Sequence, residues 1–222
     1  MTKRDVMEYD VLIIGGGPSG LSAAIKIKQL AKIEEKEISV CLVEKGVEIG
    51  SHILSGAVVD PVALNELFPE WQTKGAPLKT KVKKDIFNLF SKKKNLSIPH
   101  FLMPPLMSNK DNYIISLGDL SNWLSEEAEN FGVEIYPGFT AQEPLFNNKN
   151  ELIGILTGDM GRDTNGNETN NFVPGIEIHA KYSLVAEGTR GSITKQIEKK
   201  LSLRDKSDPQ KYGLGFKEIW RV

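Results

Sequence analysis

Three glycines near the start of the chain have the spacing of a loop that binds phosphate groups. Gly15, Gly17 and Gly20 form the pattern G-x-G-x-x-G, between an apolar stretch rich in β-branched residues and an amphipathic stretch. This context predicts a strand, a tight turn and a helix. The first glycine would allow the turn, the second would let a pyrophosphate approach the main chain, and the third would let the helix pack on the strand. The pyrophosphate would lie at the helix N-terminus, where main-chain N–H groups point toward it.

A carboxylate follows at the position where such folds hold a ribose. Glu44 comes directly after a second apolar run, residues 38–43, and lies 24 residues beyond Gly20. A carboxylate there accepts hydrogen bonds from the ribose hydroxyls and repels a 2′-phosphate, which argues against NADP. The two strands and the helix between them predict a dinucleotide-binding βαβ unit over residues 1–50.

The remaining chain predicts further elements around this unit. Two helices are expected, over residues 61–71 and 117–131. Strands are expected over residues 133–136, 141–146, 152–158, 173–179, 182–186 and, at the C-terminus, 216–222. The strands between residues 141 and 179 are expected to form a meander, with a long polar loop over residues 161–171. Between the helices lie a stretch with seven lysines, residues 79–94, and an apolar, proline-broken stretch, residues 96–107.

Two features favour FAD over NAD as the dinucleotide. Residues 15–24 and the Val-Glu-Lys at residues 43–45 resemble the first nucleotide motif of two-dinucleotide-fold flavoproteins. Residues 186–191, Ala-Glu-Gly-Thr-Arg-Gly, resemble their second FAD motif, at the end of a later strand. The predicted fold class is α/β, a Rossmann-like FAD/NAD(P)-binding fold of the two-dinucleotide-fold flavoprotein type. It would carry a β-meander and an inserted membrane- and quinone-contact segment.

Several further segments resemble one family, the electron-transfer flavoprotein–ubiquinone oxidoreductases. They occur in collinear order at residues 44–61, 66–71, 75–78, 112–118, 132–138 and 212–218. The resemblance implies an enzyme that takes electrons from reduced electron-transfer flavoprotein and passes them to ubiquinone at a membrane. The family uses FAD and one [4Fe–4S] cluster. This chain has a single cysteine, Cys41, which cannot replace a four-thiolate site, so the chain itself is not expected to ligate the cluster.

The resemblance and the motifs together assign site residues. The residues expected to bind FAD are Gly15, Gly17, Pro18, Ser19, Gly20, Glu44, Lys45, Ser55, Gly56, Ala57, Ala141, Gly188 and Arg190. Those expected at the membrane or the quinone are Ile49, Ile53, Leu54, Leu64, Leu67, Phe68, Phe101 and Leu102. Ser55 to Ala57 would lie near the isoalloxazine ring. No side chain is expected to act as a catalytic acid or base, since the ring carries the redox chemistry, and no metal site is expected.

The composition excludes other classes of partner. With 28 Lys and Arg against 29 Asp and Glu, the net charge is −1, which lacks the basic excess typical of nucleic-acid binding. No apolar run reaches the roughly 18 residues that span a bilayer, and no signal peptide is recognised. Apolar wedges beside lysines suit an anionic leaflet. A peripheral, monotopic contact is therefore expected at the cytoplasmic face of a bacterial inner membrane, the counterpart of the matrix side of the mitochondrial inner membrane.

The expected organisation has four parts. They are the βαβ unit over residues 1–50, the inserted segment over residues 51–110, the rest of the FAD-binding domain over residues 111–200, and the start of a truncated substrate domain over residues 201–222. Because the family pattern continues beyond residue 222, the chain is expected to be a fragment. Two alternatives stay open: a geranylgeranyl-reductase-like or monooxygenase-like flavoprotein, and a nucleotide-binding module without turnover.

Overall fold

The computed structural model describes residues 4–54, 56–216, 218, 220 and 221. The chain divides into two compact units, residues 1–54 together with 121–222, and residues 55–120. The functional division expected from the sequence, with a membrane-contact insertion over residues 51–110, stays a prediction.

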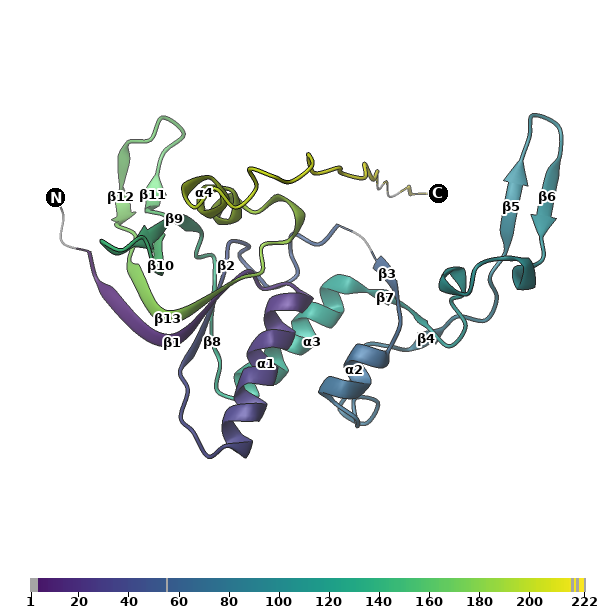
Figure 1. The fold of residues 1–222 in the computed structure, drawn as a ribbon, viewed down its shortest axis with the longest axis horizontal. Coiled ribbons are helices and arrows are strands. Elements are labelled where there is room, and N and C mark those ends of the chain that lie inside the picture. Colours follow the sequence, from purple (N-terminus) through teal and green to yellow (C-terminus); the bar gives the residue numbers. More distant parts are fainter. Residues whose placement is uncertain (1–3, 55, 217, 219, 222) are drawn as a thin grey trace. The chain divides into compact units, whose positions relative to one another are not determined.

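A six-stranded sheet forms the core of the first unit (Figure 1). Its strands lie in the order β8 (Glu134–Pro137), β2 (Val40–Glu44), β1 (Val6–Ile14), β13 (Glu177–Val185), β10 (Leu152–Thr157) and β9 (Ala141–Phe146). The first four strands run parallel, and β10 is antiparallel to both of its neighbours. Helix α1 (Pro18–Ile33) links β1 to β2 on one side, whereas β13 joins β1 on the other. The strand order therefore reverses between β1 and β13, the kind of point at which open α/β sheets bind ligands.

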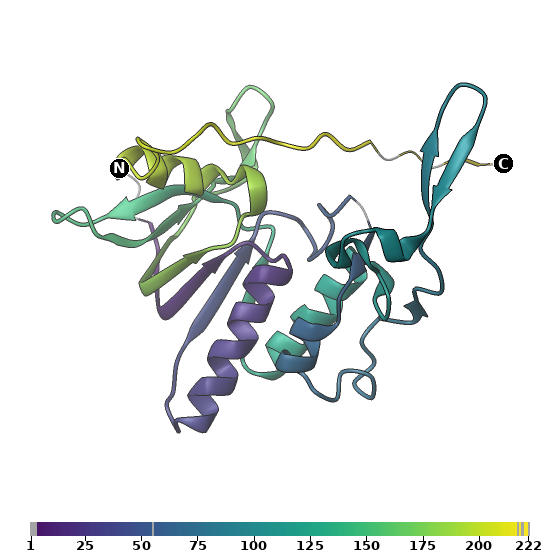
Figure 2. The same ribbon diagram turned by 45° about the vertical axis from the view of Figure 1, so that its right-hand side comes forward.

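Helices cover both faces of this sheet because successive side chains of a strand point to opposite sides. On β1, Ile13 faces α1, since its Cγ2 would lie 3.2 Å from a Cβ placed on Gly20. Leu12 and Ile14 instead join a buried cluster with Ile193 of helix α4 (Ser192–Lys200). Figure 2 shows α1 running beside β1 and β2, and α4 beside β9. The Rossmann-like α/β class predicted from the sequence is confirmed.

The meander is formed by β9, β10 and the first part of β13, and one prediction about it was wrong. The separate strands expected at residues 173–179 and 182–186 are replaced by the single strand β13. The strand continues through Lys181, whose Nζ donates to Oδ1 of Asp10 on the neighbouring β1 at 2.6 Å. Lys181, which lies between the two expected strands, is thus part of a cross-strand pair.

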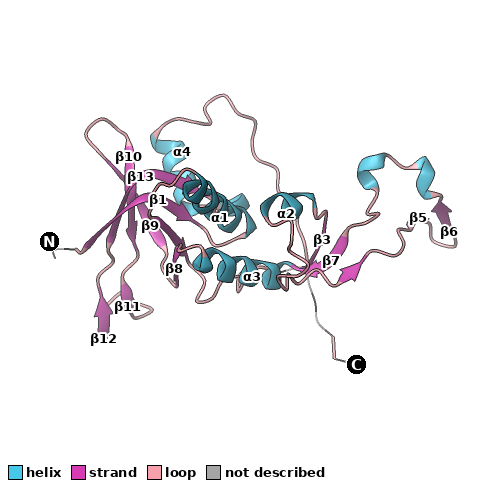
Figure 3. Ribbon diagram, turned by 90° about the horizontal axis from the view of Figure 1, so that it is seen from below, coloured by secondary structure: helices cyan, strands magenta, loops and turns pink. Residues whose placement is uncertain are grey.

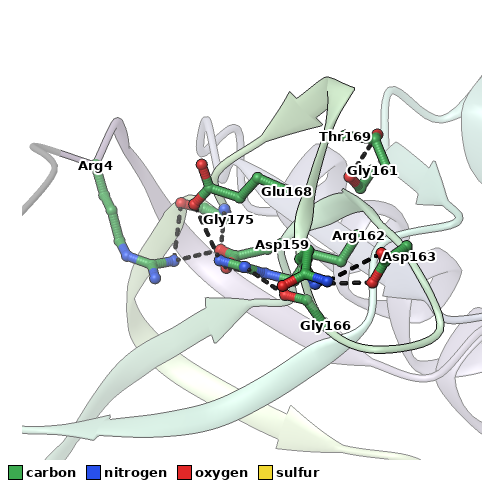
Figure 4. A network of polar contacts seen from close by, with 10 residues as sticks. Arg4, Asp159, Gly161, Arg162, Asp163, Gly166, Glu168, Thr169 and Gly175 are labelled. Carbon is green, nitrogen blue, oxygen red and sulfur yellow. Dashed lines mark hydrogen bonds and ion pairs between the residues drawn. The ribbon is translucent and has the colours of Figure 1, made fainter.

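A hairpin occupies most of the stretch expected as a polar loop, which corrects a second prediction. Strand β11 (Met160–Arg162) pairs with β12 (Glu168–Val173). The Arg162 guanidinium donates to Oδ2 of Asp159 at 2.7 and 3.1 Å and lies 4.7 Å from the ring centroid of Phe172. Arg4 donates to the carbonyl of Gly175 at 3.2 Å and lies 3.3 Å from Asp159 (Figure 4). Polar contacts rather than apolar periodicity form this hairpin, so the sequence pattern did not reveal it.

The second unit contains small antiparallel sheets and short helical turns (Figure 3). One sheet has the order β3 (Gly56–Val59), β7 (Tyr113–Ser116), β4 (Thr80–Lys81), and β5 (Phe87–Phe90) pairs with β6 (Asn95–Ile98). The 3-10 turns η1 (His100–Leu102) and η2 (Pro105–Met107) follow β6. Helix α2 spans only Val62–Leu67, so the helix expected over residues 61–71 ends early. The Trp71 indole donates to Asn65 and packs edge-on against Tyr113, which holds the following turns instead.

The remaining elements agree in part with those predicted from the sequence. Helix α3 (Leu117–Asn130) forms where an amphipathic helix was predicted, and β8 follows it. A 3-10 turn, η3 (Gly188–Arg190), links β13 to α4. The strand expected over residues 216–222 is absent from the described residues there, since Phe216, Glu218, Trp220 and Arg221 have no regular secondary structure. Residues 217, 219 and 222 lie outside the described part of the chain.

Candidate functional site

The glycine loop lies at the carboxyl end of β1, at the point where the strand order reverses. Gly15 has a φ of 114°, and a Cβ there would lie 2.5 Å from the carbonyl oxygen of Ala186, which follows β13. The Gly15 N–H donates to the carbonyl of Val43 on β2 at 2.9 Å, and the N–H of Ala186 donates to the carbonyl of Ile14 at 2.8 Å. The loop is thus joined to the ends of both neighbouring strands, and only glycine fits its first position.

The second and third glycines have different surroundings. Gly17 is the N-cap of α1, with extended backbone, and no heavy atom lies within 4 Å of a Cβ placed there. The cap makes no side-chain hydrogen bond, and the first turn has no acidic residue. At Gly20 a Cβ would overlap the carbonyl oxygen of Gly15 and lie 3.3 Å from Cβ of Ala186. Gly20 therefore permits close packing of the helix on the strands, whereas Gly17 leaves open space before the helix N-terminus.

Glu44 ends β2, and main-chain groups hold its carboxylate. Its Oε2 accepts from the N–H of Gly16 and its Oε1 from the N–H of Gly46, both at 2.8 Å. The Glu44 side chain is only 14% exposed, and Nδ1 of His52 lies 3.8 Å from Oε1. Gly16 and Gly46 were not singled out from the sequence. A Cβ would lie 2.5 Å from Cδ1 of Ile49 at Gly16 and 2.6 Å from Oγ of Ser51 at Gly46, so a larger residue at either position would displace a neighbouring side chain.

The second flavin-type motif follows β13 and lies next to the glycine loop, since Ala186 contacts Gly15. Gly188 has a φ of 74°, and a Cβ there would meet no heavy atom within 4 Å. The Arg190 guanidinium lies 4.7 Å from the ring centroid of Tyr212, in the segment after α4. The side-chain amide of Gln210 in the same segment donates to the carbonyl of Thr189 at 3.3 Å. The turn after β13 is therefore held by the chain that follows α4, a contact the sequence did not predict.

The other residues assigned to FAD have varied positions. Pro18 and Ser19 begin α1, and Lys45 is exposed after β2. Ala141 is buried in the core cluster of the first unit. Gly56 and Ala57 lie in β3 of the second unit, paired with Ser116 and Ile115 of β7. Ser55 lies outside the described residues. Their contact with FAD stays a prediction.

The residues assigned to the membrane or quinone fall into two groups. Ile49, Leu64 and Phe68 are buried, so their side chains pack inside their units rather than on an outer surface; Ile49 lies under the glycine loop. Leu54, Phe101 and Leu102 are exposed, at 76%, 84% and 64%, and Ile53 and Leu67 are half-buried. No helix among the described residues is long and apolar enough to cross a membrane.

The donor set of this site fits a dinucleotide and does not fit an iron–sulfur cluster. The uncapped N-terminus of α1, the open space at Gly17 and the fixed carboxylate of Glu44 supply donors for a diphosphate and acceptors for a ribose. Cys41, the one cysteine of the chain, is buried in β2. Among the described residues no group of three or more His, Cys, Asp or Glu side chains could hold a metal ion.

Comparisons with known proteins agree with a dinucleotide site at the glycine loop. Residues 10–66, which include the glycine loop and Glu44, match the family model of an FAD binding domain. Over 99% of its length the chain is 54% identical to electron transfer flavoprotein-ubiquinone oxidoreductase of Pseudomonas aeruginosa. It is 52% and 48% identical, each over 99% of its length, to the mitochondrial proteins of that name from Dictyostelium discoideum and Homo sapiens. The resemblance predicted from the sequence is confirmed. The chain spans 40%, 36% and 36% of the lengths of these three relatives.

Solved structures share the fold at low sequence identity. A geranylgeranyl bacteriochlorophyll reductase-like protein of Thermoplasma acidophilum aligns with a TM-score of 0.59 at 17% identity, over 86% of this chain and 42% of that one. The p-nitrophenol 4-monooxygenase of Pseudomonas putida aligns with a TM-score of 0.56 at 16% identity, over 87% of this chain and 44% of that one. These likenesses show the fold alone, so they do not favour the activity of either protein.

Proposed function

We propose that this chain is the FAD-binding part of an electron transfer flavoprotein-ubiquinone oxidoreductase. The proposed reaction takes electrons from reduced electron-transfer flavoprotein and passes them to ubiquinone. One observation carries the proposal: about half of the residues are identical to enzymes of that name over nearly the whole chain. The activity and both partners belong to relatives that are more than twice as long, and the [4Fe–4S] cluster of the family would need thiolates from outside this chain.

Within this proposal the residues of the glycine loop bind and orient the cofactor. The first-turn N–H groups of α1 would face the diphosphate, and Gly17 would let it approach the main chain. Glu44 would accept from the ribose hydroxyls with the lone pairs that the N–H groups of Gly16 and Gly46 leave over. Bound FAD supplies the redox chemistry, while the protein positions it and excludes competing reactions.

Two successive experiments on the 222-residue chain test cofactor binding and then electron transfer. The purified chain is mixed with FAD and passed over a desalting column, and the visible flavin spectrum is recorded. We expect FAD to be retained; a colourless chain under all conditions would overturn the proposal. The bound flavin is next reduced anaerobically, and ubiquinone-1 is added. Reoxidation faster than that of free reduced FAD supports the quinone as acceptor, and an unchanged rate argues against it for this chain.

The membrane contact is proposed for the hairpin β5–β6 and the turns after it. Cross-strand pairing places Phe87 opposite Ile98 and Leu89 opposite Leu96 on one face. The other face is more polar, since Ser97 donates to Asn88 at 2.6 Å. Leu89 and Leu96 are 50% and 65% exposed. An isolated hairpin with one apolar face gains little stability in water, which favours an apolar surface as its partner.

Charge around the same hairpin suits an anionic leaflet. The turn between β5 and β6 contains Lys92, Lys93 and Lys94, all exposed. Phe101 and Leu106, in the turns after β6, are 84% and 99% exposed. Apolar groups that insert beside lysines bind the interface of an anionic membrane. In a bacterium this surface would face the cytoplasmic side of the inner membrane.

Flotation with lipid vesicles tests the membrane contact. The chain is mixed with phosphatidylcholine vesicles that contain phosphatidylglycerol and centrifuged through a sucrose gradient. We expect the wild type to float, and Leu89→Ser with Leu96→Ser to abolish flotation. Ile33→Ser is the matched control, because Ile33 is 75% exposed at the end of α1, far along the chain from the hairpin. Equal flotation of the hairpin variant and the control would overturn the assignment.

A further inference from the structure

The carboxylate of Glu187 is bound to the first turn of helix α4. Its Oε1 accepts from the N–H groups of Ser192 and Ile193, at 3.1 and 3.2 Å. Its Oε2 accepts from the N–H and the hydroxyl of Thr194, both at 2.8 Å. The N-cap of α4, Gly191, has no side chain to do this. A residue outside the helix therefore satisfies three main-chain donors that an uncapped helix leaves without partners.

These hydrogen bonds connect the start of the turn between β13 and α4 to the first residues of α4. A Cβ at Gly191 would overlap Oε2 of Glu187, so the main chain passes directly beside the carboxylate. Gly188, between the two, has a φ of 74° and open space at its Cβ position. The main chain is thus packed closely against Glu187 at Gly191, whereas the Cβ position of Gly188 faces open space.

The same turn is joined to the glycine loop. Ala186, the residue before Glu187, donates its N–H to the carbonyl of Ile14 at 2.8 Å, and its carbonyl lies against Gly15. Glu187 therefore holds a turn that lies next to the loop before α1. Because glycine has many accessible backbone conformations, the hydrogen bonds of Glu187 restrict the turn around Gly188.

The charge of Glu187 has a second consequence. An open helix N-terminus attracts anions, and this site has two helices that begin near the carboxyl edge of the sheet, α1 and α4. The carboxylate of Glu187 occupies the N-terminus of α4, whereas the N-cap of α1 makes no side-chain hydrogen bond. A diphosphate therefore meets available N–H groups at α1 rather than at α4.

We propose that Glu187 is a positioning residue for the flavin nucleotide. It holds the Gly188 turn in the conformation that receives the cofactor and, by capping α4, directs the diphosphate to α1. The inference rests on the proposed FAD binding. Glu187 itself makes no contact with the cofactor in this scheme, which separates its role from those of Gly17 and Glu44.

The proposal is tested by comparing Glu187→Ala with a variant that weakens the packing of α4 on the core without changing the turn. Ile197→Ala is the matched control, because Ile197 packs α4 on the core cluster away from the turn. FAD Kd is measured by quenching of flavin fluorescence, and the unfolding of each apo variant is measured in urea. We expect Glu187→Ala to raise the Kd at least about tenfold, and Ile197→Ala to change it less than about threefold at a similar loss of stability.

A rescue experiment gives a readout that a merely structural role would not change. In Glu187→Ala the N–H groups of α4 lose their carboxylate, so added acetate should restore part of the FAD affinity in this variant and in neither the wild type nor Ile197→Ala. If Glu187→Ala does not fold, the isosteric Glu187→Gln replaces it with the same expected rise in Kd. An unchanged Kd, or a Kd that follows stability equally in both variants, overturns the inference. A wild type that never binds FAD overturns the proposed function instead.

Discussion

The N–H of Gly16 donates to Oε2 of Glu44 at 2.8 Å, which ties the loop after β1 to the end of β2. The N–H of Gly46 donates to the other oxygen at the same distance. One carboxylate thus links the glycine loop, the second strand and the turn that follows it. The acidic residue expected to recognise a ribose also stabilises the loop that would receive the diphosphate.

Glu44→Gln should therefore reduce both stability and nucleotide affinity. Glutamine has one acceptor oxygen, so either Gly16 or Gly46 loses its partner at a site that is only 14% exposed. We expect the free energy of unfolding to fall by about 1–3 kcal/mol, and the FAD Kd to rise about tenfold. Urea unfolding and flavin fluorescence measure the two effects. Glu48→Gln, at an exposed position nearby, is the control; equal behaviour of the two variants would contradict this role of Glu44.

Alanine at Gly17 should mainly reduce FAD binding, whereas alanine at Gly20 should mainly reduce stability. A Cβ at Gly17 meets open space and no backbone strain, so Gly17→Ala should cost at most about 1 kcal/mol, the loss of a glycine N-cap. The methyl group would occupy the place of the diphosphate, so FAD affinity should fall strongly. At Gly20 the Cβ would overlap a main-chain carbonyl, and we expect Gly20→Ala to destabilise by more than about 3 kcal/mol.

The two glycine variants are compared by thermal unfolding without FAD and by FAD titration. The diagnostic result is a Gly17→Ala chain that is folded but binds poorly, beside a Gly20→Ala chain that unfolds at much lower temperature. A Gly17→Ala chain that binds FAD as the wild type does would show that the diphosphate does not approach the main chain there.

Local patterns were sufficient to predict the part of the fold around the glycine loop. The apolar runs that became β1 and β2 are buried on both faces, and the glycine spacing reflects contacts within a few residues or with the adjoining strand. Helix α3 likewise followed from its apolar periodicity. In each case the information lies in residues close together in the sequence.

Features that depend on distant contacts were missed. The continuous strand β13 was predicted as two strands separated at residues 180 and 181, and the partner of Lys181 in the sheet, Asp10, lies 171 residues earlier in the chain. The hairpin at Arg162 is held by an ion-pair network, which leaves no apolar period. Glu187 has no signature as a cap, because a glycine stands at the N-cap position and the carboxylate reaches the helix from outside.

Asp10 should make stability depend on pH in the acid range. The hydrogen bond from Lys181 Nζ, together with those from the N–H and hydroxyl of Ser39, lowers the pKa of Asp10 to about 2. The unfolded chain has an aspartate pKa near 3.9. The folded pKa is the lower one, so the contribution of Asp10 is fully present above about pH 4 and is lost as the pH falls toward about 2.

Asp10→Asn removes this dependence. We expect the wild type to be more stable than the variant near neutral pH, and the difference to shrink as the pH falls from about 4. Urea unfolding over a pH series measures it, with Glu8→Gln at an exposed position on the same strand as the control. A difference between wild type and Asp10→Asn that is constant from neutral pH to about pH 3 would contradict the assigned ion pair.

The rate at which the Cys41 thiol reacts with a labelling reagent should report cofactor binding. Burial, and to a smaller extent the charge of Glu134 on the neighbouring β8, raises the pKa of the Cys41 thiol to about 12. The thiolate is the reactive form, so 5,5′-dithiobis(2-nitrobenzoate) should react with the folded chain only when the sheet opens. A cofactor that binds only the folded state stabilises it, by about 2.7 kcal/mol at a concentration of one hundred times Kd. Saturating FAD should therefore slow labelling by up to about one hundredfold.

The control is a Cys41→Ala chain with Ile33→Cys, whose thiol would stand at a 75% exposed position and react rapidly with or without FAD. Rapid labelling of Cys41 in the wild type, or a rate that FAD leaves unchanged while the flavin spectrum shows binding, would contradict a buried β2 coupled to the site.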